Sequence, residues 1–211
     1  MREAREDMVE RQLVARGIRV EAVIEAMREV PRERFVPTES SERAHCDQAI
    51  GIAAGQTISQ PFIVARMSEL IATLPEGAKV LEIGAGSGYQ TAILVHMGFE
   101  VHAVELVAEL AEGARERLAE LGLSPASLTV ADGRRGLVEH APYDGVIAAA
   151  FIKRLPKAWT RQLAPEGLII APIGRKGNQM LCEWRLMPDG KLQKRMMEPV
   201  RFGPLVRGGW L

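Results

Sequence analysis

The sequence predicts an α/β fold in which a doubly wound, mostly parallel sheet carries helices on both faces. Apolar runs of strand length alternate with amphipathic segments of helix length through the middle of the chain. One apolar run, Val80–Ile83, breaks into three glycines within five residues, Gly84–Gly88, and a helical pattern then resumes. Two later runs, Met180–Leu186 and Leu192–Met197, flank the turn Pro188-Asp189-Gly190 and predict an antiparallel hairpin at one edge of the sheet.

Composition limits the class of protein. At 211 residues the chain fits one domain with a large core. Lys plus Arg and Asp plus Glu both number 27, so the net charge is zero and no nucleic-acid partner is expected. Cys46 and Cys182 form no CxxC pair, so neither a metal site nor a disulfide framework is expected. Without an apolar leader or an apolar run of membrane-spanning length, we expect a soluble, cytoplasmic protein with no membrane partner. The sequence does not give the oligomeric state, for which we favour a monomer.

The N-terminal part of the chain is predicted to be helical. Residues 3–16 show a helical apolar pattern that ends at Gly17, and residues 20–30 show a second that ends at Pro31. These helices precede the glycine turn and belong to no strand–helix repeat, so we expect them to cover the site. The single domain 1–211 then divides into N-terminal helices and a loop (1–60), a cofactor-binding core (61–175) and a C-terminal hairpin with an edge strand (176–211).

The core elements follow in order from Pro61, which suits the first turn of a helix. The predicted strands of the core are Lys79–Ile83, Glu100–Glu105, Ser127–Val130, Gly145–Phe151 and Leu168–Pro172. The predicted helices between them cover 90–97, 107–121 and 156–163. Ligands of such sheets bind beyond the carboxyl ends of the strands, so we expect the site there.

The glycine turn favours S-adenosylmethionine over a dinucleotide. Its pattern is Gly84-x-Gly86-x-Gly88, and Tyr89 stands where the dinucleotide fingerprint has its third glycine. Glu82, two residues before the turn, would repel a phosphate but would attract the ammonium group of S-adenosylmethionine, directly or through water.

Two acids farther along the chain support a nucleoside ligand. Glu105 ends the second strand, where an acid can accept both ribose hydroxyls; its alternative role is to cap the following helix. Asp132-Gly133 ends the third strand, where the Asp could accept from the adenine amino group, although Asp-Gly is also an ordinary turn. The predicted cofactor-binding residues are Glu82, Gly84, Ala85, Gly86, Ser87, Gly88, Glu105, Leu106, Asp132 and Gly133.

The acceptor side offers no obvious base. The exit of the fourth strand, Ala148–Phe151, lacks the Asn or Asp that polarises an amine, and no histidine is evidently paired with a carboxylate. A carboxylate acceptor needs no base, because it is ionised at pH 7 and needs only placement. Ser59 is the main catalytic candidate, although a Ser just before Pro61 is also a good helix N-cap. The residues beside Ser59 that we expect to bind substrate are Gln56, Thr57 and Ile58.

The chain resembles the protein-L-isoaspartate O-methyltransferase family over nearly its whole length. The most specific strings are Gly55-Gln56-Thr57-Ile58-Ser59-Gln60-Pro61 and Gly86-Ser87-Gly88-Tyr89-Gln90, and Val30-Pro31-Arg32-Glu33 adds to them. The resemblance implies a Rossmann-like methyltransferase sheet and methyl transfer from S-adenosylmethionine, with S-adenosylhomocysteine as product, to the α-carboxylate of L-isoaspartyl residues. The resulting ester closes to a succinimide and opens partly to aspartate, which begins repair. Ser59 matches the family's active-site serine, and Glu105, Asp132 and Gly133 match positions that hold ribose and adenine.

Departures from the family pattern gather near the acceptor side. The family has a proline-rich stretch before the substrate loop, Gly55–Pro61, and this chain has Ala49–Ala53 there. His45 stands where an aromatic residue is usual, and Ala85 replaces a threonine in the glycine turn. Three alternatives therefore stay open. They are a methyltransferase with another carboxylate or a small-molecule acceptor, a non-catalytic S-adenosylmethionine-binding module and, more distantly, an NAD-dependent oxidoreductase.

Overall fold

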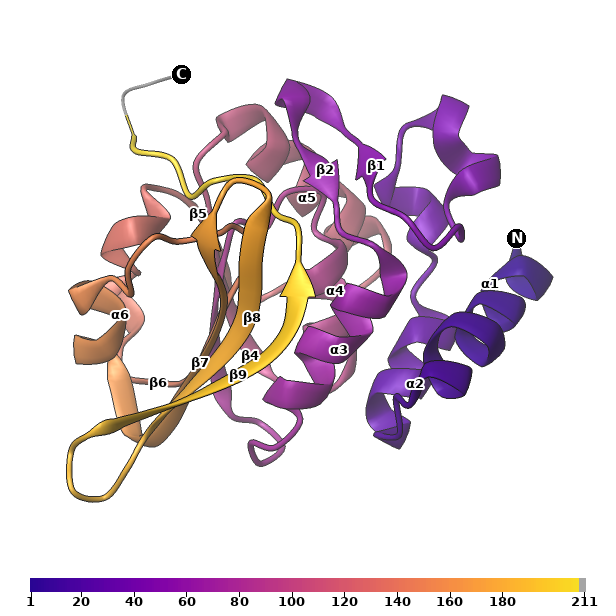
Figure 1. Cartoon of the computed structure of the whole chain (residues 1–211). Helices are drawn as coiled ribbons and strands as arrows, with labels where there is room; N and C mark the ends of the chain where they lie inside the picture. The colour runs from indigo at the N-terminus through magenta and orange to yellow at the C-terminus, as the bar shows by residue number, and fades with distance from the viewer. Residues whose placement is uncertain (209–211) are drawn as a thin grey trace.

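A computed structural model describes residues 1–208 and shows a seven-stranded sheet in the order β5-β4-β3-β6-β7-β8-β9 (Figure 1). The first five strands in this order are parallel, and β8 and β9 are each antiparallel to the strand before them. The strands are β3 Lys79–Ile83, β4 Glu100–Glu105, β5 Ser127–Val130, β6 Tyr143–Ala148, β7 Leu163–Arg175, β8 Asn178–Leu186 and β9 Leu192–Val200. The predicted doubly wound sheet with an antiparallel edge is confirmed.

Helices cover both faces of this sheet, as predicted. Helices α3, α4 and α5 lie on one face and α6 on the other, while α1 and α2 form an outer layer beside α3 and α4 (Figure 1). The α-helices are α1 Arg2–Met8, α2 Glu21–Glu29, α3 Pro61–Ile71, α4 Tyr89–His96, α5 Ala108–Glu120 and α6 Lys157–Arg161. None of the helices within residues 1–208 is long and apolar enough to cross a membrane.

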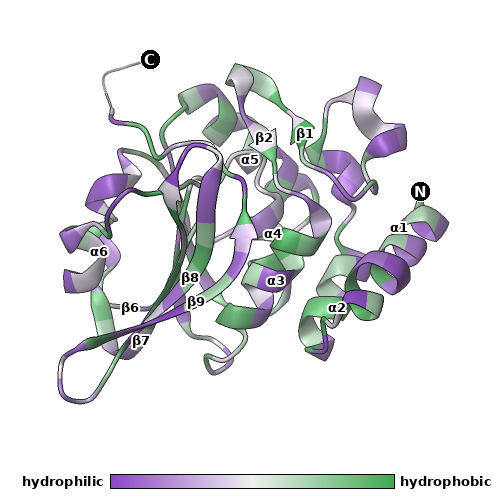
Figure 2. Cartoon of the chain, in the orientation of Figure 1, coloured by the Kyte–Doolittle hydropathy of each residue, from purple (hydrophilic) through white to green (hydrophobic). Residues whose placement is uncertain are grey.

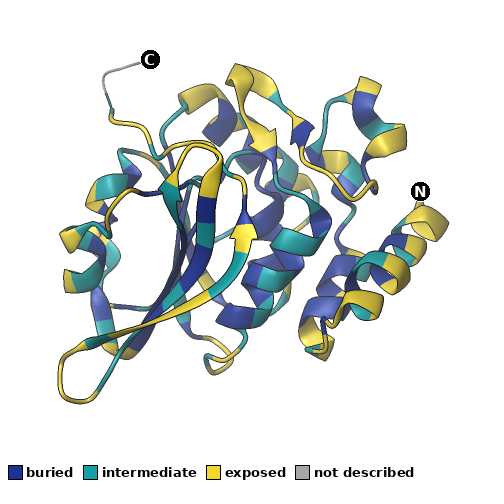
Figure 3. Ribbon diagram, in the orientation of Figure 1, coloured by how far each residue is buried: buried dark blue, intermediate teal, exposed yellow. Residues whose placement is uncertain are grey.

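Three apolar clusters correspond to these layers. One joins the N-terminal helices to α3, α4 and α5; a second fills the space between α3, α4 and the sheet; the third packs α6 and the segment before β6 against the opposite face. The central strands are the most apolar and the most buried part of the molecule (Figures 2 and 3). Alternate residues of β3 show the division, because Val80 faces the α3 side and Leu81 faces the α6 side.

Several predicted boundaries were wrong. The first helix continues from α1 as a π-helical turn, Val9–Leu13, and a 3-10 turn, Val14–Arg16, before Gly17. Strand β6 ends at Ala148 rather than Phe151. Strand β7 is longer than predicted at both ends, because Leu163 pairs with Tyr143 of β6 and Ile173–Arg175 form a hairpin with the start of β8. The loop after residue 50 holds a small antiparallel pair, β1 Ile50–Gly51 and β2 Thr57–Ile58.

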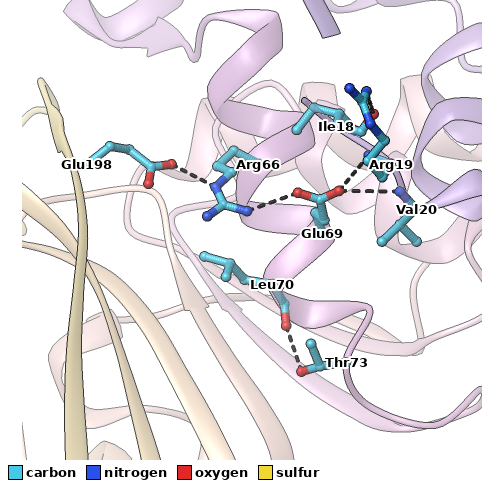
Figure 4. Close-up of polar contacts among 8 residues, drawn as sticks. All are labelled: Ile18, Arg19, Val20, Arg66, Glu69, Leu70, Thr73 and Glu198. Carbon is cyan, nitrogen blue, oxygen red and sulfur yellow. Dashed lines mark hydrogen bonds and ion pairs between the residues drawn. The ribbon is translucent and has the colours of Figure 1, made fainter. Parts of the chain in front are cut away.

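One carboxylate links the N-terminal layer to the core. Glu69 of α3 accepts hydrogen bonds from the backbone N–H groups of Arg19 (2.7 Å) and Val20 (3.3 Å), at the start of α2 (Figure 4). Its other oxygen pairs with Arg66 at 2.9 Å, and Arg66 in turn donates to Glu198 of β9 at 3.0 Å. Val20 has no capping side chain of its own, so Glu69 supplies the acceptor that α2 lacks.

We predict that Glu69→Ala lowers the free energy of unfolding by about 1–2 kcal/mol, because it removes the acceptor for two helix-start N–H groups. Glu69→Gln retains one oxygen acceptor and should lose less. Urea denaturation measures both, with exposed Glu25→Ala of α2 as the control that stays within about 0.5 kcal/mol of wild type. Equal values for Glu69→Ala and Glu25→Ala would contradict the linking role.

Candidate functional site

A cavity opens at the carboxyl ends of β3, β4 and β6, where strand order reverses beside β3. Its floor is the glycine turn between β3 and α4, and its walls come from the substrate loop, the end of β4 and a C-terminal segment. The residues that line it are Gln56–Ser59, Val64, Gly84–Ser87, Tyr89, Gln90, Glu105–Val107, Gly133, Ala149, Ala150 and Pro204–Val206. The structure therefore brings most of the predicted site residues together, whereas Glu82, Gly88 and Asp132 do not line the cavity.

The glycine turn presents bare backbone to this cavity. Gly84 has a φ of +84°, and its N–H donates to Val104 O at 2.7 Å, which fixes the turn against the neighbouring strand. A Cβ built on Gly84 would meet no atom within 4 Å, so the space above it is open to a ligand. Gly88 serves packing instead, because a Cβ there would lie 3.2 Å from Ala114 of α5.

Glu105 holds the turn and the start of α5 together. Its Oε2 accepts from Gly86 N–H at 2.8 Å, and its Oε1 accepts from Leu106 N–H at 2.7 Å and Val107 N–H at 3.0 Å. Glu105 thus holds the N–H of Val107, the N-cap of α5, in line with the helix-capping alternative, while its ribose-binding role stays a prediction. A carboxylate has about four acceptor positions and three are in use. To accept both ribose hydroxyls, Glu105 must share or release one backbone donor.

Glu82 lies inside the protein rather than at the cavity surface. It is fully buried, its Oε2 accepts from Thr91 Oγ1 at 2.6 Å, and its Oε1 has no partner among the described residues. Burial raises the pKa of Glu82 to about 7, an effect that the nearby Glu105 charge increases and the Thr91 hydrogen bond opposes. The predicted role of Glu82, to attract the ammonium group directly or through water, stays a prediction, and Glu82 would act from beneath the turn rather than from the cavity wall.

Asp132 is also occupied by its own neighbours. Arg134 donates to both carboxylate oxygens, with its Nη2 2.6 Å from Oδ2, and Gly208 N–H donates to Oδ2 at 3.2 Å. The Arg134 hydrogen bond lowers the pKa of Asp132 to about 2. The adjacent Gly133 does line the cavity, and a Cβ there would lie 2.5 Å from Ile83, so only glycine fits.

The substrate loop includes β2 of the β1–β2 pair, and Ser59 directly follows β2. Ser59 lines both this cavity and a second one, so it lies at their boundary. The N-cap of α3 is Gln60, and no side chain caps that helix, so the alternative role of Ser59 as an N-cap is wrong. The second cavity has a volume of about 650 Å³ and lies on the far side of Ser59, between the loop and the end of β9. Ala149 and Ala150 line both cavities, so the two spaces meet at the exit of β6.

Arg32 is a buried residue whose role the sequence did not reveal. Its Nε donates to Ala44 O at 2.8 Å and its Nη2 donates to Ser59 O at 2.7 Å. Its guanidinium carbon lies 4.8 Å from the centre of the Tyr89 ring, at the start of α4. Arg32 thus joins the substrate loop to the helix that follows the glycine turn. Its position in the Val30-Pro31-Arg32-Glu33 string was the only signal.

The C-terminal segment is the second feature that the sequence did not reveal. Phe151 N–H donates to Gly203 O at 2.8 Å, and Leu205 N–H donates to Phe151 O at 2.9 Å. These bonds place Pro204, Leu205 and Val206 against the cavity as an apolar wall. No local pattern signals a contact of this kind.

Two histidines pair with carboxylates that the sequence did not make obvious. His45 lies 3.3 Å from Glu33, and His102 Nε2 lies 3.0 Å from Glu100. Sequence spacing missed the first pair because twelve residues separate its members. Neither pair lines either cavity, so both are structural contacts.

The donor set fits S-adenosylmethionine. Glu105 offers a carboxylate at the surface of the cavity, the glycine turn offers open backbone, and Leu106, Val107 and Leu205 offer apolar contact for a flat base. The buried Glu82 Oε1 leaves an unsatisfied oxygen beneath the turn, which suits a positively charged group or a water.

Comparison with known proteins gives a consistent family. The sequence matches the family described as protein-L-isoaspartate(D-aspartate) O-methyltransferase (PCMT) over residues 3–209. A protein-L-isoaspartate O-methyltransferase of Methylorubrum extorquens is 48% identical over 98% of this chain and 90% of the relative. One of Gloeobacter violaceus is 45% identical over 95% of this chain and 97% of the relative.

The fold is shared with solved structures of the same description. A Plasmodium falciparum structure in complex with S-adenosyl-L-homocysteine superposes with a TM-score of 0.82 at 24% identity, covering 96% of this chain and 98% of the other. A second structure, described as protein-L-isoaspartate O-methyltransferase, gives a TM-score of 0.82 at 26% identity and covers 97% of this chain and 65% of the other.

The raised pKa of Glu82 predicts a specific pH dependence of stability. Between pH 4.5 and 7 the folded protein keeps a proton that the unfolded chain has released, so stability falls as pH rises through this window. Glu82→Gln has no such proton. From pH 5 to pH 8, wild-type protein should therefore lose about 2–3 kcal/mol more unfolding free energy than the Gln variant.

Urea denaturation of cofactor-free protein at both pH values measures this difference. Glu29→Gln, at an exposed position of α2, is the control and should follow the wild-type pH dependence. The same pH dependence in wild type and Glu82→Gln would show that Glu82 is ionised in the folded protein at pH 5.

Proposed function

The chain belongs to the protein-L-isoaspartate O-methyltransferase family of S-adenosylmethionine-dependent carboxyl methyltransferases, and on this basis we propose that it methylates the α-carboxylate of L-isoaspartyl residues in damaged proteins or peptides. The observation that carries the proposal is the meeting of two cavities at Ser59, one built like a cofactor site and the other open toward solvent beside the substrate loop.

The first cavity would hold the cofactor. Glu105 would accept from the ribose, the turn Gly84–Ser87 would lie along the amino-acid part, and Leu106 with Gly133 would contact the base. The bound cofactor supplies a methyl group activated on a sulfonium. Asp132 reaches the base only if Arg134 or Gly208 gives up its hydrogen bonds, so we assign Asp132 the smaller share of binding.

The protein's task on the acceptor side is placement. An α-carboxylate is ionised at neutral pH, and one of its oxygens takes the methyl group without any proton transfer. Ser59, between the two cavities, would orient that carboxylate, with Gln56 and Thr57 as further donors from the same loop. Arg32 holds the Ser59 carbonyl, so the loop is fixed before substrate arrives. The next backbone nitrogen of the peptide then attacks the ester carbonyl, methanol leaves, and the succinimide that forms begins repair.

A second candidate is a different carboxylate or small-molecule acceptor. The Ala49–Ala53 segment favours this candidate, because it departs from the family pattern and Ala49 lines the second cavity. Ala54, the next residue, has a left-handed φ of +53°. A non-catalytic module that only binds S-adenosylmethionine is the third. We propose a cytoplasmic monomer for each of these readings.

Labelled S-adenosylmethionine with a matched pair of peptides, one isoaspartyl and one aspartyl, separates these readings. We predict that label enters only the isoaspartyl peptide, in a base-labile ester. Labelling of neither peptide, with cofactor binding intact by calorimetry, would favour the binding module or another acceptor.

Replacing Ser59 by Ala tests the acceptor role. Loss of a hydrogen bond to a charged group costs about 1.5–3 kcal/mol, so kcat/KM for the isoaspartyl peptide should fall about 10-fold to 100-fold. The Kd for S-adenosylmethionine should change much less. Ser124→Ala, at an exposed loop position away from both cavities, should behave as wild type. Unchanged turnover in Ser59→Ala would leave the loop backbone as the orienting group.

A further inference from the structure

Three segments at the mouth of the second cavity carry an excess of positive charge. Residues 149–156, 172–180 and 199–208 contain six Lys and Arg side chains and no Asp or Glu, in a chain whose net charge is zero. Five of these cations form what we call the basic rim: Lys153, Arg154, Arg175, Lys176 and Arg201. Arg201 lines the second cavity itself, and Gly177 and Asn178, directly after Lys176, line it too.

Backbone hydrogen bonds hold the three segments side by side. Ile152 N–H donates to Pro172 O at 2.9 Å, and Gly174 N–H donates to Ile152 O at 3.0 Å, which places Lys153 next to the β7–β8 turn. The buried Gln179 side chain joins that turn to the third segment, accepting from Phe202 N–H at 2.7 Å and donating to Phe202 O at 3.1 Å. The rim is therefore fixed by the fold of the sheet edge.

The rim cations are exposed and unpaired. None of the five forms an ion pair or a side-chain hydrogen bond with another of residues 1–208. Two acids in adjoining elements have partners of their own, since Glu198 pairs with Arg66 and Asp47 with Arg16. Elsewhere most buried or half-buried arginines have carboxylate partners, for example Arg28, Arg115 and Arg185. The positive field at this mouth is therefore uncompensated by its surroundings.

We propose that the basic rim selects isoaspartyl segments that carry further Asp or Glu residues beside the damaged one. This inference rests on the proposed function, because the anion it recognises is the flank of a peptide whose isoaspartyl carboxylate reaches Ser59. An extended peptide advances about 3.3 Å per residue, so roughly three residues on one side of the isoaspartate lie within one Debye length at 0.1 M salt. Exposed charges at that range raise association rates more than they add contact energy.

The rim favours a peptide over a polynucleotide. Arg201 lines a cavity of about 650 Å³ that reaches Ser59, and the other four cations lie on segments whose neighbouring residues line it. No continuous basic stripe runs along one element of the described chain. A side chain and its neighbours fit such an opening, and the flanking carboxylates then lie over the rim.

Three isoaspartyl peptides with one common core test the proposal, with flanks of Asp and Glu, of Ser and Gly, or of Lys. At 20 mM salt, kcat/KM should be about 3-fold to 10-fold higher for the acidic peptide than for the neutral one, and lowest for the lysine peptide. At 500 mM salt the three values should converge. Equal values at 20 mM salt would overturn the basic rim while leaving methylation itself established. Methylation of none of the peptides would overturn the proposed function and this inference with it.

A charge-matched pair of variants locates the effect. Arg175→Gln/Lys176→Gln should reduce the acidic-to-neutral ratio of kcat/KM at least 2-fold, with its main change in the salt-dependent part. Arg2→Gln/Arg161→Gln removes the same charge at exposed positions outside the rim and should keep the wild-type ratio. An unchanged ratio in the first variant would overturn the assignment. A second result would also overturn it: equal kcat/KM for the acidic and neutral peptides, together with micromolar binding of a single-stranded DNA 20-mer at 150 mM salt.

Discussion

The site depends on one carboxylate that serves three backbone donors. Glu105 ends β4, and through Gly86, Leu106 and Val107 it ties the glycine turn of one strand to the helix that follows the next. Without that acceptor, three N–H groups beside the cavity would lose their protein partner. The turn would keep its backbone bonds to Val104 and the bond that Arg117 donates to Ser87 O. Glu105 also lines the cavity, so the residue that holds the turn in place is the one that we propose accepts from the ribose.

The parts of the fold that could be predicted from the sequence are those with local causes. Strands β3, β4 and β5 have the predicted boundaries because each is an apolar run closed by a glycine or an acid in a turn. The glycine turn and Glu105 were found for the same reason. The prediction began strand β7 at Leu168 and missed Leu163–Gly167. Within that segment only Leu163 pairs with β6, and hydrophobic periodicity does not signal such a contact.

The missed parts of the site have distant causes. Arg32 bonds to Ser59, twenty-seven residues away, and a lone Arg after a proline looks like a surface cation until that contact is seen. Pro204–Val206 reach the cavity through Phe151, and the rim cations come together only when the sheet edge forms. Asp132 shows the opposite case. Its neighbour Arg134 is close in sequence, yet spacing alone did not indicate that it would occupy both carboxylate oxygens.

The apolar wall formed by Pro204, Leu205 and Val206 has a consequence for the order in which the molecule comes into being. A ribosome makes the glycine turn more than a hundred residues before it makes this wall, and the wall can reach Phe151 only after it has left the exit tunnel. A nascent chain can therefore complete most of its sheet while the cavity still lacks one side. The cavity therefore gains its last wall only when residues 204–206 reach Phe151.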